Sequence, residues 1–96
     1  MRPSEVLAQH RGRVRQIALR HGVRDVRVFG SIARGEDTEG SDLDLLVEPT
    51  EATTLLDIGA IQQELTQLLG VDVDIVTPNA FPEAHRSRIL EESAQL

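Results

Sequence analysis

The sequence contains no cysteine, lysine, tryptophan or tyrosine, and its only aromatic residues are Phe29 and Phe81. Without cysteine, disulfides and thiolate metal sites are excluded, which fits a reducing compartment. Without Tyr or Trp there is little surface on which nucleobases can stack, which argues against a protein that reads single-stranded nucleic acid directly. Without lysine there is no Walker-type phosphate-binding motif.

No apolar run is long enough to serve as a signal peptide or to cross a bilayer, so we expect a cytoplasmic location and no membrane partner. A length of 96 residues predicts a single domain, residues 1–96, with one modest core.

The net charge of −6 hides a strong asymmetry along the chain. Residues 1–34 hold eight of the ten arginines against only Glu5 and Asp25, whereas residues 35–96 hold two arginines and all the other acids. An acidic half can hold metal ions, and a basic half can meet phosphate or an acidic partner. The simpler interpretation of the basic half is a solvated basic helix.

Apolar periodicity predicts an α+β fold, a small mixed β-sheet flanked by helices in the order αβ(α)βαβα. The predicted helices cover residues 4–20, 54–69 and 82–93, and the predicted strands cover residues 25–29, 42–48 and 71–76. The clearest helix has apolar side chains at Leu55, Ile58, Ile61, Leu65 and Leu68. Thr54 resembles its N-cap and Gly70 its stop. Residues 30–41 are predicted to form a turn, with one helical turn after Ser31, and a polar loop.

Two carboxylates lie two residues apart on the second predicted strand. Strand side chains alternate, so Asp42 and Asp44 project from one face about 6.6 Å apart along the backbone, while Leu43 and Leu45 enter the core. Aspartate is a poor strand residue, and like charges repel unless a cation lies between them. Their hard oxygens suit Mg²⁺. The alternative is that Asp42 is a strand-start residue and Asp44 a surface acid.

A glycine-bounded turn, Gly30-Ser31-Ile32-Ala33-Arg34-Gly35, precedes this pair. Glycine lets the backbone bend sharply and approach a ligand closely. The amides of the following helical turn can then hold phosphate oxygens, and the Ser31 hydroxyl can add a hydrogen bond. A simple helix N-cap is the alternative role of Ser31.

A third acid follows on the last predicted strand, where Asp72 and Asp74 share a face by alternation. Spacing alone does not choose between them, although Asp72 is nearer the turn at Gly70 and Asp74 lies one step further in. Carboxylates that bridge two metals about 3.5–4 Å apart stabilise both the attacking and the leaving oxygens of an in-line displacement.

Together, Gly30-Ser31-x-Ala33-Arg34-Gly35, then Ser41-Asp42-x-Asp44-Leu45, then Val73-Asp74-Ile75-Val76 resemble the motifs of the minimal nucleotidyltransferases of the DNA polymerase β superfamily. The chain is especially similar to the MNT antitoxins that are paired with HEPN-domain toxins. The resemblance covers nearly the whole chain, from the strand before Gly30 to the last helix.

The resemblance implies a role for each matching residue. Gly30 and Ser31 are expected to hold the β- and γ-phosphates of a nucleoside triphosphate. Asp42 and Asp44 are expected to bind metal. Asp74 is expected to be the third catalytic acid, which binds the catalytic metal and helps to activate the acceptor hydroxyl. Arg34 is expected either to contact the nucleotide or to hold the loop by a salt bridge, since arginine suits both roles.

The resemblance also implies a function. We expect transfer of AMP from ATP, with two Mg²⁺ ions or Mn²⁺, to a tyrosine of a HEPN-domain toxin that a neighbouring gene encodes, in a hetero-oligomer. The first alternative is a non-catalytic antitoxin that binds the toxin through its basic first helix and the apolar parts of its last helix. The second is a nucleotidyltransferase with a small-molecule or nucleic-acid acceptor, which the absence of an acceptor-binding domain disfavours.

Overall fold

In the computed structural model, which describes residues 1–96, the chain begins with helix α1 (Pro3–Arg20). Pro3 suits the first helical turn because it lacks an N–H, which would find no partner inside the helix there. The buried side chains Leu7, Val14, Ile17 and Ala18 recur at helical spacing and line one face. That face packs on the sheet and on the second long helix.

Helix α2 (Leu55–Leu69) begins and ends as the sequence predicts. The Asp57 carboxylate accepts a hydrogen bond from the Thr54 backbone N–H at 2.8 Å, and the Thr54 hydroxyl accepts one from the Asp57 N–H at 3.2 Å. Gly70 ends the helix at a φ of +69°. The core side of α2 carries Ile61, Leu65 and Leu69. Leu55, predicted to lie on this side, is instead 89% exposed because the packed core begins a turn later.

The strands are β1 (Asp25–Phe29), β2 (Leu43–Glu48), β3 (Val73–Val76) and β4 (Ala94–Gln95). They lie in the order β3-β2-β1-β4, with β2 antiparallel to β1 and parallel to β3. The sheet is therefore mixed, and the predicted α+β fold is confirmed. The short β4, which pairs antiparallel with β1, was not predicted.

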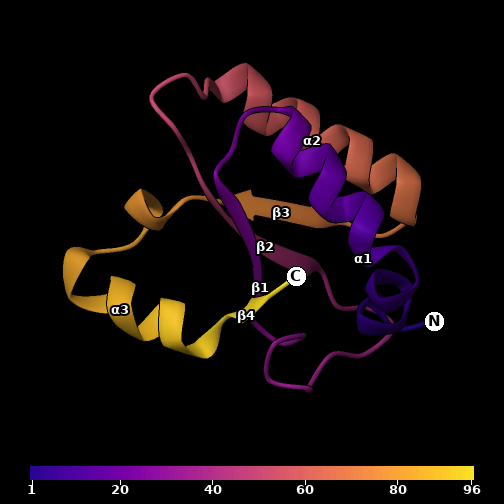
Figure 1. The fold of residues 1–96 in the computed structure, drawn as a ribbon. Coiled ribbons are helices and arrows are strands. Elements are labelled where there is room, and N and C mark those ends of the chain that lie inside the picture. Colours follow the sequence, from indigo (N-terminus) through magenta and orange to yellow (C-terminus); the bar gives the residue numbers. More distant parts are fainter.

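The two faces of the sheet have different neighbours (Figure 1). Helices α1 and α2 lie side by side on one face, over a core that includes Val26, Val28, Leu43, Leu45 and Val73. The short helical turn η1 (Pro78–Ala80) and helix α3 (Glu83–Glu92) lie on the other side. No helix is both long and apolar enough to cross a bilayer.

Helix α3 covers the second face of the sheet only loosely. It buries none of its own residues, and a cavity of about 230 Å³ remains between Leu90 and the sheet residues Arg27 and Leu46. The connection to α3 is fixed by Arg86, whose Nε donates to the carbonyl oxygens of Pro78 and Phe81, both at 3.1 Å. The cavity lies toward the end of β2, where Arg27 pairs with Leu46.

Candidate active site

The turn after β1 is a single helical turn without a helix after it. The Arg34 N–H donates to the Gly30 carbonyl oxygen at 3.2 Å, and the Glu36 N–H donates to the Ser31 carbonyl oxygen at 2.8 Å. Gly30 has a φ of +74°, in the left-handed region that favours glycine. A Cβ atom at this position would lie 2.5 Å from Oδ2 of Asp44. The sequence therefore needs glycine here both for the turn and for the approach of the turn to Asp44.

The pairing of β2 with β3 settles how the predicted acids lie relative to one another. Asp44 stands opposite Asp74 in this parallel pair, so the two side chains project from the same face. Asp42 directly precedes β2 and shares the face of Asp44 by alternation. Asp72 takes the place beside Asp42, and both line a shallow pocket of about 250 Å³. The structure thus brings Asp42, Asp44 and Asp74 together, with Asp74 as the acid that borders Asp44.

Asp44 is the electrostatic centre of this cluster. It is half-buried, whereas Asp42 and Asp74 are exposed. Burial raises the pKa of the Asp44 carboxyl above its usual value, and the neighbouring charges of Asp74 and Asp42 raise it further. The Arg34 guanidinium acts in the opposite direction. Burial and neighbouring negative charges both disfavour the ionised form of a carboxylate, and a cation bound beside it stabilises that form.

The donor set fits Mg²⁺. No three Asp, Glu, His or Cys side chains lie close enough together to hold one ion by themselves. Mg²⁺, however, is usually bound by only one or two carboxylates, together with waters and substrate phosphates. Asp42 with Asp44, and Asp44 with Asp74, supply two such pairs. A triphosphate on the Gly30–Gly35 turn would supply the remaining oxygens.

Arg34 lies at the edge of the site and is ion-paired. Its Nε is 3.1 Å from Oε2 of Glu36, and both side chains are exposed. Arg34 thus makes an ion pair within its own loop, and both of its expected roles, contact with the nucleotide and support of the loop, stay predictions. Its charge also acts on Asp44, so the same guanidinium is close enough to influence the reacting groups. Exposed ion pairs of this kind contribute little free energy, so a phosphate group can replace Glu36 as the partner of Arg34.

Two features of the site were not predicted from the sequence. Phe29 stands opposite Asp44 in the β1–β2 pair, and its ring meets Phe81 edge to face with 6.0 Å between centroids. The only two aromatic side chains of the protein are thus in contact with each other on the face of the sheet that carries Asp44. The alternation of β1 placed Phe29 on this face, but no local pattern pointed to Phe81, which comes from the segment before α3. The second feature is the burial of Asp37, whose carboxylate accepts a hydrogen bond from the backbone N–H of Ser4.

The backbone N–H groups of Ser31, Ile32 and Ala33 have no hydrogen-bond partner within the chain, and they belong to a turn that lies beside paired carboxylates. This arrangement suits phosphoryl or nucleotidyl transfer. The family model described as nucleotidyltransferase domain matches residues 7–96. The chain therefore belongs to the nucleotidyltransferase domain family, and it is an enzyme of that class.

The chain is also similar to individual relatives and solved structures. A solved structure of a minimal nucleotidyltransferase superimposes with a TM-score of 0.88 and 46% identity, covering 97% of this chain and 95% of the other. The protein adenylyltransferase MntA of Thermococcus cleftensis is 37% identical over 91% of this chain and 85% of its own length. The crystal structure of a toxin–antitoxin with AMP-PNP shares the fold, with 22% identity and a TM-score of 0.66 over 81% of this chain and 65% of the other.

Proposed function

We propose that this chain transfers AMP from ATP to the hydroxyl group of a tyrosine on a partner HEPN-domain toxin, and thereby silences that toxin. The observation that carries the proposal is the placement of Asp42, Asp44 and Asp74 on one face of the sheet beside the Gly30 turn. Two comparisons support it. The Thermococcus relative is named a protein adenylyltransferase, and a toxin–antitoxin with AMP-PNP shares the fold.

The order of the strands suggests the direction of the reaction. The Gly30–Ser31 turn follows β1, Asp44 lies on the middle strand β2, and Asp74 lies on β3 on its far side. With the β- and γ-phosphates on the turn, pyrophosphate leaves toward β1, and in-line displacement requires the acceptor to approach from the side of β3. Asp74 is then the residue that orients the tyrosine hydroxyl.

Each bond and proton of this transfer has a place in the site. The tyrosine oxygen forms a bond to the α-phosphorus of ATP, the bond from that phosphorus to the bridging oxygen breaks, and pyrophosphate departs. Asp74 takes the proton of the hydroxyl. Bound Mg²⁺ would neutralise the charge that develops on the phosphate oxygens, and Asp42, Asp44 and Asp74 would hold it there.

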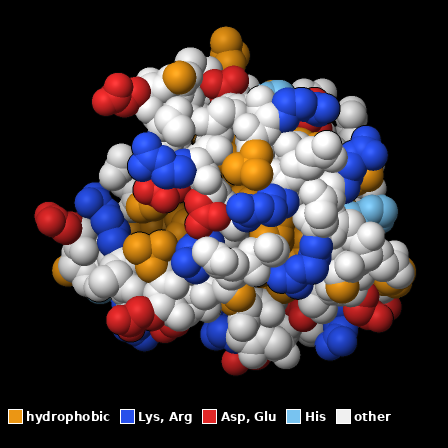
Figure 2. Space-filling model, in the orientation of Figure 1, with side chains coloured by type: hydrophobic (Ala, Val, Ile, Leu, Met, Phe, Trp, Pro, Cys, Tyr) orange, Lys and Arg blue, Asp and Glu red, His pale blue; other side chains and the backbone are white.

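A binding-only antitoxin is not favoured by the surface of the first helix. Of the eight arginines in residues 1–34, only Arg11 and Arg13 lack an ion pair with an acidic side chain. Figure 2 shows arginine side chains (blue) spread over one face with acidic side chains (red) against several of them. On α1 itself Arg15 and Arg20 are paired with acids, so Arg11 and Arg13 are the cations that this helix presents without an acidic partner.

Intact-mass spectrometry tests the proposal directly. The protein encoded by the neighbouring gene is incubated with this chain, ATP and Mg²⁺, and we expect its mass to increase by one or more AMP units. The increase should be absent with the Asp44→Asn variant. A stable complex without any mass increase would contradict the proposal and favour masking of the toxin by binding.

The two roles of Arg34 can be separated by a pair of variants. We expect Arg34→Gln to raise the KM for ATP about tenfold, because a charge-assisted bond to phosphate is worth at least about 1.4 kcal/mol. Glu36→Gln removes the same ion pair but keeps the guanidinium, so its KM should be unchanged or lower. Equal increases of KM in both variants would show that Arg34 acts only by holding the loop.

A further inference from the structure

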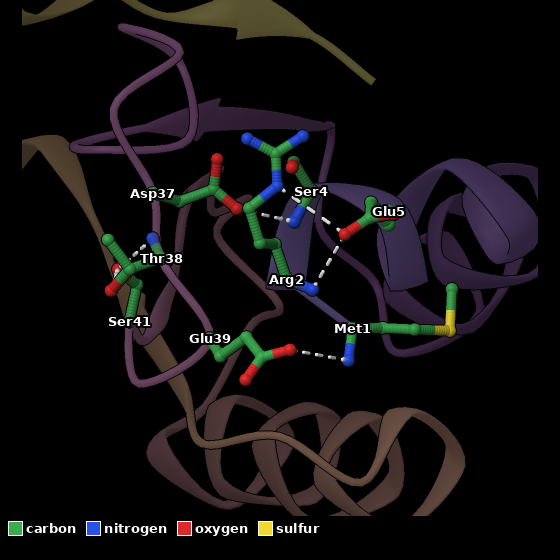
Figure 3. Close-up of polar contacts among 8 residues, drawn as sticks. All are labelled: Met1, Arg2, Ser4, Glu5, Asp37, Thr38, Glu39 and Ser41. Atoms are coloured by element: carbon green, nitrogen blue, oxygen red, sulfur yellow. Dashed lines mark hydrogen bonds and ion pairs between the residues drawn. The ribbon is translucent and has the colours of Figure 1, made fainter.

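Asp37 is the only charged side chain that is buried in this protein, with 5% of its surface exposed. Its Oδ2 accepts a hydrogen bond from the backbone N–H of Ser4 at 2.9 Å, across 33 positions of sequence (Figure 3). Ser4 lies in the first turn of α1, where backbone N–H groups have no partner inside the helix and the helix dipole favours an anion. The Ser4 N–H lowers the pKa of Asp37, so the carboxylate is charged at neutral pH.

One further contact joins the same two segments, residues 1–5 and residues 37–41, which we call the N-terminal clasp, and two hydrogen bonds within residues 37–41 shape its loop. The amino group of Met1 is 3.6 Å from Oε1 of Glu39. The Thr38 N–H donates to the Ser41 hydroxyl at 2.8 Å, and the Ser41 N–H donates to the Thr38 carbonyl at 3.0 Å, which closes a tight turn (Figure 3). The Met1–Glu39 pair is exposed and weak, so the buried Asp37 bond is the firm attachment of the clasp.

The clasp ends one residue before Asp42. Strand β2 begins only at Leu43, so Asp42 lies outside the strand and at the end of this loop, while Asp44 is fixed inside the sheet. On the N-terminal side of Asp42, the buried Asp37 bond and the Thr38–Ser41 turn fix the backbone. On its C-terminal side, the Leu43 N–H donates to the Asp72 carbonyl oxygen at 2.9 Å and ties the chain to the segment that leads into β3. Asp42 is therefore held by the sheet on one side and by the clasp on the other, whereas Asp44 is held by the sheet on both sides.

We propose that Asp37 is a positioning residue for the metal site: by anchoring the 37–41 loop to the start of α1, it holds Asp42 where it can share a cation with Asp44. The inference rests on the proposed function, since it assigns Asp42 to metal binding. It predicts a specific defect when Asp37 is lost, a weakened affinity for metal with little change in the maximal rate.

The test compares Asp37→Ala with two matched variants. In Asp37→Asn the side-chain oxygen can still accept from Ser4. In Asp57→Ala a similar carboxylate-to-backbone bond is lost at the start of α2, away from the site. Mn²⁺ binding is measured by electron paramagnetic resonance in the presence of ATP. We expect Asp37→Ala to bind Mn²⁺ about tenfold more weakly, which is the lower end of the loss seen when a direct hydrogen-bond partner of a metal ligand is removed. Raised Mn²⁺ should restore transfer, and Asp37→Asn should stay within a few-fold of the unsubstituted protein.

Two results would overturn the inference. One is an unchanged Mn²⁺ affinity in Asp37→Ala, and the other is an equal loss in Asp57→Ala, which would mean that lowered stability alone weakens binding. If Asp37→Ala does not fold, hydrogen exchange of the unsubstituted protein decides: the Ser4 amide should be protected, and fast exchange there would show that the clasp is not formed. An unsubstituted protein that binds no Mn²⁺ with ATP would instead contradict the proposed function.

Discussion

Replacing Asp44 with asparagine is expected to reduce nucleotidyl transfer more than about 100-fold while leaving the fold intact. Loss of an outer-shell partner of a metal ligand already lowers activity by about 10–100-fold, and Asp44 is the residue that both proposed metal-binding pairs share. Asparagine has nearly the same shape, so the contact with the Gly30 turn is kept. Single-turnover transfer of labelled AMP, with metal and ATP at saturating levels, measures the effect.

The same substitution should make the metal-free protein more stable at neutral pH. The pKa of Asp44 is raised by burial and by Asp74 and Asp42, so its ionisation opposes folding. This destabilisation is absent below the ordinary value of 3.8 and grows as the pH rises through the higher folded pKa. The thermal midpoint of Asp44→Asn should therefore exceed that of the unsubstituted protein at pH 7, and the difference should vanish in acid.

Glu48→Gln is the matched control for both measurements. Glu48 lies on the same strand and the same face as Asp44, but at the other end, paired with exposed Arg24. It should leave transfer unchanged and should not raise the thermal midpoint. A variant with asparagine at position 44 that retains transfer would contradict the assignment of Asp44 to the metal site.

The spacing of apolar residues along the sequence predicted most of the fold, because it indicates which side chains of each element are buried. Alternation in β1 and β2 and the 3.6-residue period of α2 report contact with one core, and the capping pair Thr54–Asp57 is local. The two-residue strand β4 has no such pattern, since both of its residues are exposed. Its pairing with β1 depends on where α3 ends relative to the sheet, and that position is set by the whole fold.

The candidate site divides in the same way. Asp42 and Asp44 were predicted as a pair because two residues on one strand fix their separation. The choice between Asp74 and Asp72 required the register of β2 against β3, which sets Asp74 opposite Asp44. Asp37 had no signal, because its partner is a backbone N–H that is 33 positions away. The features that could not be predicted are contacts between segments far apart in the sequence, which only the tertiary structure brings together.

Gly30→Ala is expected to have an effect as large as the loss of Asp44 itself, although it removes no chemical group. At a φ of +74° an alanine is strained by about 1–2 kcal/mol. Its Cβ would also lie 2.5 Å from Oδ2 and 3.3 Å from Cγ of Asp44. Either the turn or the carboxylate must move, and in the proposed reaction the turn holds the triphosphate and the carboxylate holds the cation. We expect transfer to fall more than about 100-fold, since a displacement of about 1 Å can cost that much.

Gly22→Ala separates strain from the clash with Asp44. Gly22 has a φ of +88°, and a Cβ there would meet nothing within 4 Å, so it introduces a comparable backbone strain at the far end of α1. Both variants should lose thermal stability, but only Gly30→Ala should lose transfer and Mn²⁺ binding. If Gly30→Ala transfers AMP as well as Gly22→Ala does, the Asp44 carboxylate can move aside without loss. The close approach of turn and acid would then be a feature of packing and not of the reaction.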